Sequence, residues 1–293
     1  MYDVIIVGAG PAGLTAALYA GRTSRKILVL EAKAYGGQII KANKIVNYPG
    51  ILEISGFDFA THLYEQVKQL GVEIKYETVN RIDEDLTVHT TKSIYQAKSI
   101  IIATGSENKR LNLPRENELV GKGISYCATC DGSFFKGKTV AVLGEDKIAL
   151  EDVLYLADIV KKVYWIPRNK SEKENQKLVE EIKLKDNVER IESQTITSLL
   201  GEDKLEEIEL DQNQRIKVDG LFIAIGQSPK NEIFKNVIDM NEDGYIVSDD
   251  GVHTSHPKIY VAGDTRVKTL RQLTTAVSDG AIAATTAIKE MED

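Results

Sequence analysis

The chain contains two cysteines, Cys127 and Cys130, within the sequence Cys-Ala-Thr-Cys-Asp-Gly. Two thiols at this spacing can cycle between a dithiol and a disulfide, and a position at a helix N-terminus favours the thiolate. Exchange with a partner disulfide then proceeds by thiolate attack through a mixed disulfide. Asp131 follows directly, where its side chain can cap the helix. We expect a redox-active pair, the alternative being two buried structural thiols.

The N-terminal residues predict elements that bind a dinucleotide. Residues 3–7, Asp-Val-Ile-Ile-Val, form the continuous apolar run that a buried parallel strand shows. Gly-Ala-Gly-Pro-Ala-Gly follows at 8–13, then a small-residue helix over 14–22 and a second strand over 26–31. This strand, helix and strand order turns a lone glycine pattern into a credible dinucleotide-binding fingerprint.

Each glycine of this first turn has a physical role. Gly8 makes the tight turn, Gly10 lets the backbone approach a pyrophosphate, and Gly13 lets the helix pack closely on the strand. The helix N-terminus supplies unpaired N–H groups and partial positive charge for the phosphates. Glu31 ends the second strand and is placed to accept hydrogen bonds from ribose hydroxyls, the alternative being a solvated strand end.

The chain then repeats this plan. Strands are predicted over 99–105 and 221–226, ending in Ala-Thr-Gly and Ala-Ile-Gly, and a further strand over 256–264 ends in Gly-Asp. A long helix rich in Ala and Thr follows within 271–288, and its small residues suit close packing. The predicted fold class is α/β, with two Rossmann-like, three-layer nucleotide-binding domains and the second inserted in the first. The expected segments are residues 1–110, 111–241 and 242–293.

A second nucleotide-binding turn is predicted within residues 139–159, but its chemistry is altered. Gly144 and Ala149 stand where such a turn needs small residues, whereas Glu145 and Asp146 occupy the positions between them. A Cβ there obstructs the approach of a pyrophosphate. Two like charges about 4 Å apart cost about 4 kcal/mol at a surface-like dielectric, which is near a thousandfold in affinity. We expect both acids to repel an anionic coenzyme.

Bulk properties exclude several classes of function. The net charge of −7 argues against a nucleic-acid partner, which requires a basic face. No apolar run approaches the length of a membrane span, and no leader pattern precedes the first strand, so we expect a cytoplasmic protein without a membrane partner. The two cysteines and four scattered histidines do not form a metal-ligand pattern, so no metal is expected.

A series of short motifs occurs in the order seen in the low-molecular-weight thioredoxin reductases. These motifs are Gly-Ala-Gly-Pro-Ala-Gly, Gly-Gly-Gln-Ile (36–39), Val-Asn-Tyr-Pro-Gly (46–50), Cys-Ala-Thr-Cys-Asp-Gly and Val-Ala-Gly-Asp before Arg-Gln-Leu-Thr-Thr-Ala. The chain resembles that family over essentially its whole length. The resemblance implies a homodimeric flavoprotein that binds FAD in the outer domain and reduces thioredoxin. In most members the inserted domain carries the dithiol and binds NADPH.

The resemblance also implies roles for individual residues. Cys130 should face the flavin, Cys127 should exchange with the partner protein, and Asp131 should act as acid or base. The pyrophosphate loop matches Gly8, Gly10, Pro11, Ala12 and Gly13, and the ribose position matches Glu31, followed by Ala32. Positions around the flavin match Gly36, Gly37, Gln38, Asn47, Arg271, Gln272 and Leu273. The remaining matched cofactor positions are Val79, Ala103, Thr104, Gly105, Gly263 and Asp264.

The NADPH motifs of that family are altered here. A Gly-x-Gly-x-x-Ala turn and a His-Arg-Arg run are usual, but Asp146 replaces the middle glycine and only Arg168 remains of the run, between Pro167 and Asn169. A 2′-phosphate is best held by paired guanidinium groups. The chain therefore resembles the ferredoxin-dependent flavin thioredoxin reductases, in which ferredoxin replaces NADPH as the donor. Two alternatives stay open: an NAD(P)H-dependent reductase with an atypical site, and an FAD-bound redox sensor without turnover.

Overall fold

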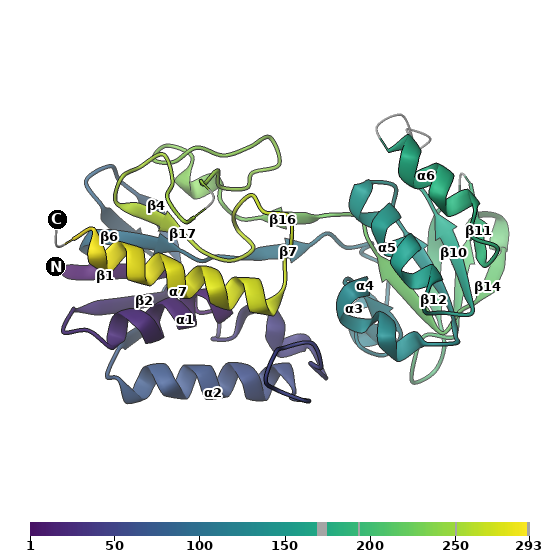
Figure 1. Ribbon diagram of the computed structural model, residues 1–293, viewed down its shortest axis with the longest axis horizontal. Helices are drawn as coiled ribbons and strands as arrows, with labels where there is room; N and C mark the ends of the chain where they lie inside the picture. The colour runs from purple at the N-terminus through teal and green to yellow at the C-terminus, as the bar shows by residue number, and fades with distance from the viewer. Residues whose placement is uncertain (169–174, 193, 250, 292–293) are drawn as a thin grey trace. The chain divides into compact units, whose positions relative to one another are not determined.

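The structure, a computed structural model, describes residues 1–168, 175–192, 194–249 and 251–291. It divides into two compact units, one formed by Met1–Glu107 with Ser228–Asp293 and the other by Asn108–Gln227. Both units place helices against largely parallel sheets (Figure 1). The prediction of an α/β chain in which one unit interrupts the other is thus confirmed.

The predicted end of the insertion at residue 241 needs correction, because the second unit ends at Gln227. Residues 228–241 belong to the first unit, where Phe234 and Ile238 are buried with Ile5 and Ile100. The sequence offered only the glycine at 226 and a short polar stretch beyond it, and the burial of these two apolar side chains depends on contacts far along the chain.

The first unit is built on a sheet in the order β3-β2-β1-β6-β5-β4, with β17 also paired to β6. The register of β1 aligns Val4 with Ile27 of β2 and with Ser99 of β6, both in parallel. The strands are β1 (Tyr2–Val7), β2 (Ile27–Glu31), β3 (Glu73–Tyr76), β4 (Val79–Ile82), β5 (Thr87–Thr90), β6 (Ile94–Ile102) and β17 (Ile259–Val261). The helices are α1 (Pro11–Gly21), η1 (Gly37–Lys41), α2 (Gly56–Gln69), η4 (Glu232–Phe234) and α7 (Leu273–Lys289).

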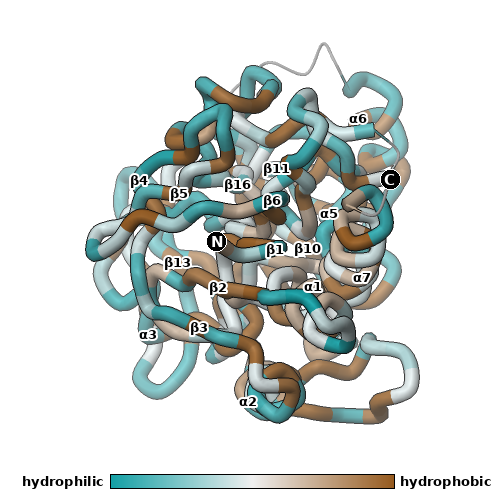
Figure 2. The backbone as a smooth tube through the Cα atoms, turned by 90° about the vertical axis from the view of Figure 1, so that its left-hand side faces the viewer, coloured by the Kyte–Doolittle hydropathy of each residue, from teal (hydrophilic) through white to brown (hydrophobic). Residues whose placement is uncertain are grey.

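Both faces of this sheet are buried, which explains the unbroken apolar run of β1. Successive side chains of a strand point to opposite faces. Val4 and Ile6 accordingly pack under the helices, whereas Ile5 and Val7 lie in the core on the other face. Figure 2 shows β1 and β2 as largely hydrophobic segments of the tube.

The long Ala/Thr-rich helix α7 packs against α1, as its small residues predict (Figure 1). A Cβ on Gly280 would lie 2.2 Å from the carbonyl oxygen of Ala12, so only glycine permits this approach. The C-terminal end of α7 is anchored by the His253 bridge, in which Nδ1 of His253 lies 2.8 Å from Asp249 and Nε2 lies 2.8 Å from Glu290. These contacts hold α7 near its middle and at its C-terminal end.

The second unit repeats the layered plan around the parallel sheet β11-β10-β9-β15-β8. One face packs on the helices through Val140 and Val142, and the other packs on an antiparallel sheet through Ala141 and Leu143. Its strands are β8 (Ile124–Ser125), β9 (Thr139–Leu143), β10 (Lys162–Ile166), β11 (Val188–Arg190), β12 (Ile196–Leu200), β13 (Glu207–Leu210), β14 (Arg215–Lys217) and β15 (Gly220–Ile223). Its helices are α3 (Glu116–Leu119), α4 (Ala128–Asp131), η2 (Gly132–Phe135), α5 (Lys147–Ala157), α6 (Gln176–Lys183) and η3 (Asp211–Asn213).

The chain crosses between the units twice, through β7 (Ser106–Asn108) and β16 (Gln227–Pro229), which pair with each other. Within the described part of the chain, no helix has both the length and the apolar character needed to cross a membrane.

Candidate active site

The two cysteines form a disulfide with an S–S distance of 2.06 Å and a Cα–Cα distance of 5.3 Å. Cys127 is the N-cap of α4, and its Sγ accepts a hydrogen bond of 3.2 Å from the backbone N–H of Cys130. The expectation that one cysteine sits at a helix start is confirmed. A donated N–H stabilises negative charge on sulfur, so the geometry favours a thiolate at Cys127 once the disulfide is reduced.

Asp131 ends α4 and faces Ser125 at the end of β8. The hydroxyl of Ser125 lies 2.6 Å from Oδ2 of Asp131 and 3.1 Å from the backbone nitrogen of Cys127. Burial raises the pKa of the Asp131 carboxyl, and the hydrogen bond from Ser125 acts in the opposite direction. A carboxyl shifted toward neutral pH is suited to proton transfer beside a dithiol.

The first glycine turn has the geometry that a dinucleotide turn requires. Gly8 has a φ of +107°, and a Cβ there would lie 2.4 Å from the carbonyl oxygen of Ala103, so both strain and crowding exclude a side chain. A Cβ on Gly13 would lie 1.9 Å from the oxygen of Gly8. Gly10 is the N-cap of α1 and has no side chain with which to cap it. The first N–H groups of α1 therefore point to a position that an anion can occupy.

Glu31 lies against this turn, where its carboxylate accepts hydrogen bonds from the backbone N–H groups of Ala9 (2.7 Å) and Lys33 (2.9 Å). Ala32 is exposed beside it. Val79 begins β4 close to the same strand end, since Glu31 pairs with Tyr76, but its own side chain is buried in the core. The structure thus brings the proposed ribose position next to the glycine turn.

A second group of predicted residues follows the carboxyl ends of β6 and β17, strands that pair in parallel beside β1. Ala103, Thr104 and Gly105 come after β6, and Gly263 and Asp264 come after β17. A hydrogen bond between the hydroxyls of Thr104 and Thr265 (2.9 Å) joins the two turns. Ligands of open α/β sheets bind at the carboxyl ends of strands, so these turns share one candidate site with the first glycine turn.

Asp264 provides a test of whether this site fits FAD. Within the described part of the chain, its Oδ1 is buried and has no hydrogen-bond partner. Burial raises the pKa of the Asp264 carboxyl, while the charges of Lys268 and Arg271 act to lower it. Buried polar atoms are normally satisfied, and the hydroxyl of a ribityl chain is a donor of the required kind. The residues present therefore fit the cofactor.

The residues expected around the flavin also converge. Gly36 donates a hydrogen bond of 2.7 Å to the carbonyl of Ala9, and the amide of Asn47 donates one of 3.2 Å to the side chain of Gln272. The guanidinium of Arg271 lies 4.1 Å from the ring centre of Tyr245. The other members of this group lie beside these contacts in the chain, namely Gly37, Gln38 and Leu273.

Several buried residues that hold these turns in place were missed by sequence reasoning. Asp279 accepts hydrogen bonds from Gly263 N–H (3.0 Å), Arg266 Nε (3.1 Å) and Lys268 Nζ (2.8 Å). Asn231 accepts a hydrogen bond of 2.6 Å from Thr265. Breaking a buried pair leaves an uncompensated charge and is strongly destabilising. In the sequence, Asp279 stood out only as an acidic residue before a glycine within a predicted helix. Its partners lie in a preceding loop, so the sequence alone did not connect them.

The turn after β9 has the same backbone as the first glycine turn but a different chemistry. Asp146 is the N-cap of α5 with φ −75° and ψ 174°, close to the −75° and −177° of Gly10 at α1. Its carboxylate accepts a hydrogen bond of 2.9 Å from the N–H of Ala149. An N-cap side chain satisfies a donor that a bound phosphate would otherwise use. The helix N-terminus is therefore already occupied by a carboxylate of the chain itself.

Glu145 engages the remaining arginine of the predicted coenzyme site. Its Oε1 lies 3.4 Å from a guanidinium nitrogen of Arg168, and its Oε2 accepts a hydrogen bond of 3.2 Å from the backbone N–H of the same residue. The expectation that both acids act by repulsion is therefore revised, because Glu145 acts by binding the cation that would hold a phosphate. Pro167 follows β10 directly, and Asn169 lies outside the described residues.

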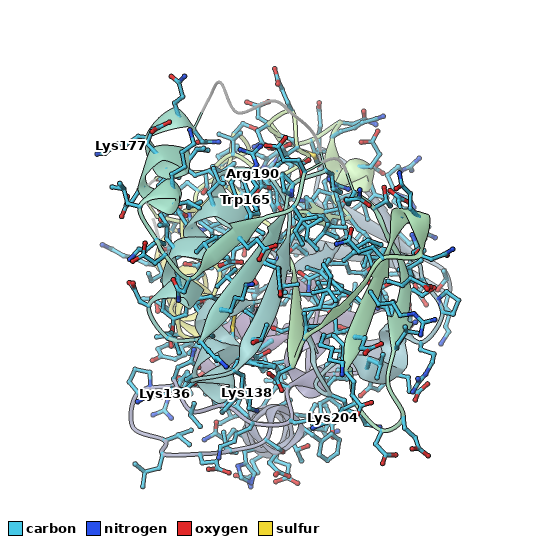
Figure 3. The ribbon with its side chains drawn as sticks, turned by 90° about the vertical axis from the view of Figure 1, so that its right-hand side faces the viewer. Lys136, Lys138, Trp165, Lys177, Arg190 and Lys204 are labelled. Atoms are coloured by element: carbon cyan, nitrogen blue, oxygen red, sulfur yellow. A yellow bond between two sulfur atoms is a disulfide. The ribbon has the colours of Figure 1, made fainter. Side chains whose placement is uncertain are left out.

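The second turn is also held by a side chain of the neighbouring strand β10. The indole N–H of Trp165 donates a hydrogen bond of 2.9 Å to the carbonyl of Gly144, and the guanidinium carbon of Arg190 lies 4.6 Å from the Trp165 ring centre. Figure 3 shows these two side chains next to each other. Asp152, six residues after Asp146 in α5, was not predicted as notable, yet burial raises its pKa to about 7, with the charges of Asp146 and Glu151 adding to the shift.

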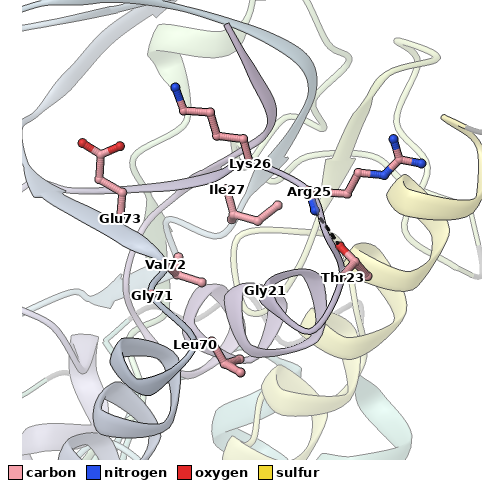
Figure 4. Close-up of a pocket in the computed structure, with 9 residues that line it drawn as sticks. All are labelled: Gly21, Thr23, Arg25, Lys26, Ile27, Leu70, Gly71, Val72 and Glu73. Atoms are coloured by element: carbon pink, nitrogen blue, oxygen red, sulfur yellow. Dashed lines mark hydrogen bonds between the residues drawn. The ribbon is translucent and has the colours of Figure 1, made fainter.

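A surface pocket of about 300 Å³ in the first unit lies away from all of these residues (Figure 4). It is lined by the segments that precede β2 and β3, including Thr23, Arg25 and Glu73. The glycine turns follow the carboxyl ends of the strands, whereas this pocket lies at their amino ends. It does not belong to the candidate site.

Comparisons with known proteins agree with this geometry. Residues 2–280 match the family described as pyridine nucleotide-disulphide oxidoreductase. The thioredoxin reductase of Treponema pallidum (strain Nichols) is 38% identical, over 97% of this chain and 95% of its own. A 34.2 kDa protein in the rubredoxin operon of Clostridium pasteurianum is also 38% identical, over 98% and 96%. The solved thioredoxin reductase from Streptococcus pyogenes MGAS5005 is 36% identical and superposes with a TM-score of 0.95, covering 100% of this chain and 98% of that one.

Proposed function

The chain belongs to the pyridine nucleotide-disulphide oxidoreductase family as a homologue of the low-molecular-weight thioredoxin reductases, and from this premise we propose that it reduces thioredoxin with electrons from ferredoxin through FAD. The observation that carries the proposal is the disulfide between Cys127 and Cys130 with Asp131 held beside it. A homodimer is part of the same proposal and rests on the family relationship.

The chemistry at the dithiol balances as a two-electron exchange. The Cys127–Cys130 disulfide takes up two electrons and two protons to become a dithiol. The dithiol then reduces the disulfide of thioredoxin through a mixed disulfide with Cys127, and Cys130 resolves that bond as the enzyme disulfide re-forms. Bound FAD would supply the electron pair. Asp131 exchanges a proton with the sulfur that changes its bonding partner.

The residues that would hold FAD follow from the site. The N–H groups at the start of α1 would receive the pyrophosphate beside Gly10, and Glu31 would receive the ribose. The buried carboxyl of Asp264 would accept a hydrogen bond from the ribityl chain, and Thr104 and Arg271 would border the flavin. These groups bind and orient the cofactor, and the glycines keep side chains out of its path.

The choice of donor rests on the second turn. Asp146 occupies the helix N-terminus and Glu145 occupies Arg168, so both groups that would bind a coenzyme phosphate have an internal partner. A donor of single electrons that binds at the protein surface avoids this site altogether, and ferredoxin is such a donor. No docking face is proposed for ferredoxin: Arg168 beside this turn pairs with Glu145, and Lys162 at the opposite end of β10 pairs with Glu189 (2.6 Å).

The competing donor is NADPH, which the family description itself favours, and one anaerobic experiment separates the two. The protein with bound FAD is mixed with excess NADPH, or with chemically reduced ferredoxin, and the loss of flavin absorbance is followed. We expect bleaching by ferredoxin and recovery of absorbance when oxidised thioredoxin is added. Rapid bleaching by micromolar NADPH would refute the proposed donor. Bleaching without any reduction of thioredoxin would indicate a redox sensor rather than a reductase.

A further inference from the structure

We propose that Ser125 is a positioning residue for proton transfer at the dithiol, because its hydroxyl links the backbone of Cys127 to the carboxyl of Asp131. The inference rests on the proposed function, in which Asp131 exchanges a proton with the cysteines. Neither the dithiol motif nor the nucleotide turns assign any role to Ser125.

The position of the hydroxyl is set by the sheet. Ser125 is buried, with 4% of its surface exposed, and it pairs with Phe222 of the adjacent strand β15. It stands at the carboxyl end of β8, directly before the turn that leads into α4. The hydroxyl is therefore carried by the parallel sheet of the second unit, while both of its partners are carried by the short dithiol segment.

The hydrogen-bond distances show the direction of this link. The Ser125 Oγ lies 2.6 Å from Asp131 Oδ2 but 3.3 Å from the carbonyl oxygen of Cys127. One hydroxyl has one proton to donate, and the shorter contact identifies the carboxylate as its acceptor. Its lone pair accepts the N–H of Cys127 at 3.1 Å. The result is a chain from an amide through a hydroxyl to a carboxylate, in which each bond strengthens the next.

A second contact completes a closed arrangement. The backbone N–H of Asp131 donates a hydrogen bond of 3.1 Å to the carbonyl of Cys127. Cys127 and Asp131 are thus joined twice, once directly and once through Ser125, so the carboxyl cannot turn away from the dithiol without breaking the buried hydrogen bond. Loss of one partner of a buried hydrogen bond costs the desolvation of the group left behind.

The link also controls when the carboxyl holds a proton. Burial favours the neutral form of Asp131, and the Ser125 hydroxyl favours the ionised form. From α5, the side chain of Tyr155 lies beside Gly132, and burial and the Ser125 hydroxyl are the influences that act on the pKa of Asp131. Asp152 of α5 interacts instead with Asp146 and Glu151. Ser125 therefore opposes the effect of burial and lowers the pKa of the Asp131 carboxyl.

The test compares Ser125→Ala with two matched variants. Ser125→Thr retains a hydroxyl on the same carbon, and Ser133→Ala removes an exposed hydroxyl of η2. The protonation midpoint of Asp131 is measured in the oxidised, FAD-loaded protein by the 13Cγ chemical shift after aspartate labelling. Asp131→Asn identifies the resonance. The pH profile of thioredoxin reduction by the pre-reduced protein is recorded in parallel.

We expect Ser125→Ala to raise the midpoint by about 1 pH unit, because a charge-assisted hydrogen bond to the ionised carboxyl is lost. The limb of the rate profile that vanishes in Asp131→Asn should move by the same amount. Ser125→Thr should restore both, and Ser133→Ala should change neither. An unchanged midpoint in Ser125→Ala, even with lowered stability, would overturn the inference by reducing Ser125 to a structural residue.

The same design separates this inference from the proposed function. If the wild-type protein reduces no thioredoxin from its pre-reduced state, the proposed function fails. The chemical-shift midpoints still decide whether Ser125 controls Asp131, because they are read from the resting disulfide form without turnover.

Discussion

The substitution Gly10→Asp places a carboxylate at the N-cap of α1, in the position that Asp146 occupies at the N-cap of α5. Gly10 and Asp146 have nearly the same backbone angles at the N-caps of α1 and α5. A Cβ on Gly10 would meet only the Cα of Gly37, at 3.9 Å, so the backbone leaves room for the first atom of a side chain. If a carboxylate at this position excludes a pyrophosphate from the second turn, it should exclude FAD from the first.

The expected magnitude follows from the charge and the site. A carboxylate about 4 Å from a phosphate charge costs about 1 kcal/mol in water and about 4 kcal/mol at an effective dielectric of 20. Gly10 is half-buried rather than exposed, which favours the upper part of that range. A cost of about 2–4 kcal/mol lowers the affinity for FAD about 30-fold to 1,000-fold. The apoprotein should lose no stability, because Asp is at least as good an N-cap as Gly.

The assay is fluorescence titration of FAD into apoprotein, with thermal unfolding of the apoprotein as the check on folding. Gly10→Asn is the matched control, since it has the same size and capping ability without the charge. We expect the Asp variant to bind FAD at least tenfold more weakly than the Asn variant. Equal losses in the two variants would refute the role of charge. Wild-type affinity in Gly10→Asp would remove the argument that Asp146 excludes a coenzyme.

Three further predictions concern the second turn, the dithiol and α7. Glu145→Gly combined with Asp146→Gly should raise NADPH affinity only about tenfold, because Asp146 is exposed and a single freed arginine replaces a pair; isothermal titration that finds full family-like affinity would contradict this. Cys130→Ser should leave FAD bound but stop electron flow to the disulfide, visible as a reduced flavin that oxidised thioredoxin does not re-oxidise; loss of FAD would point instead to a structural role. The His253 bridge raises the pKa of His253 through hydrogen bonds to its two carboxylates, so its stabilisation is complete below pH 6.5 and is lost as pH rises through the raised pKa; thermal unfolding should show this loss, and His253→Ala should abolish it.

Local sequence patterns were sufficient to predict the parts of the fold that depend on neighbours in the chain. The apolar run of β1, the glycine turn at 8–13 and the small-residue helix α7 were all found where the sequence placed them. Each depends on periodicity or on a backbone position that only glycine can occupy. The dithiol at the start of α4 was predicted in the same way, because the spacing and the following acid lie within one short motif.

The supporting contacts could not be predicted, because they join residues far apart in the chain. Asp279 holds Gly263 and two cations from a preceding loop, and Ser125 meets Asp131 only because β8 and α4 fold together. The end of the second unit was predicted at residue 241 rather than at Gln227 for the same reason. The pairing of Glu145 with Arg168 could not be predicted either. Without the position of Arg168, an acidic side chain in this turn predicts only repulsion of an anionic coenzyme.

The altered second turn keeps the backbone of a nucleotide-binding turn, and this backbone also positions α5 against the dithiol segment. Gly144 still has a φ of +149°, and a Cβ there would lie 2.1 Å from the carbonyl of Ala224, so the strand and helix still require glycine at this point. The helix that follows, α5, supports the dithiol segment, because a Cβ on Gly132 would lie 3.0 Å from both Leu156 and Tyr155. A change that unfolded the turn would therefore displace α5 from α4 and loosen the dithiol. Asp146 avoids this displacement, because its side chain caps α5. In the proposed function, a carboxylate at this N-cap excludes the coenzyme phosphate and preserves the helix on which the dithiol depends.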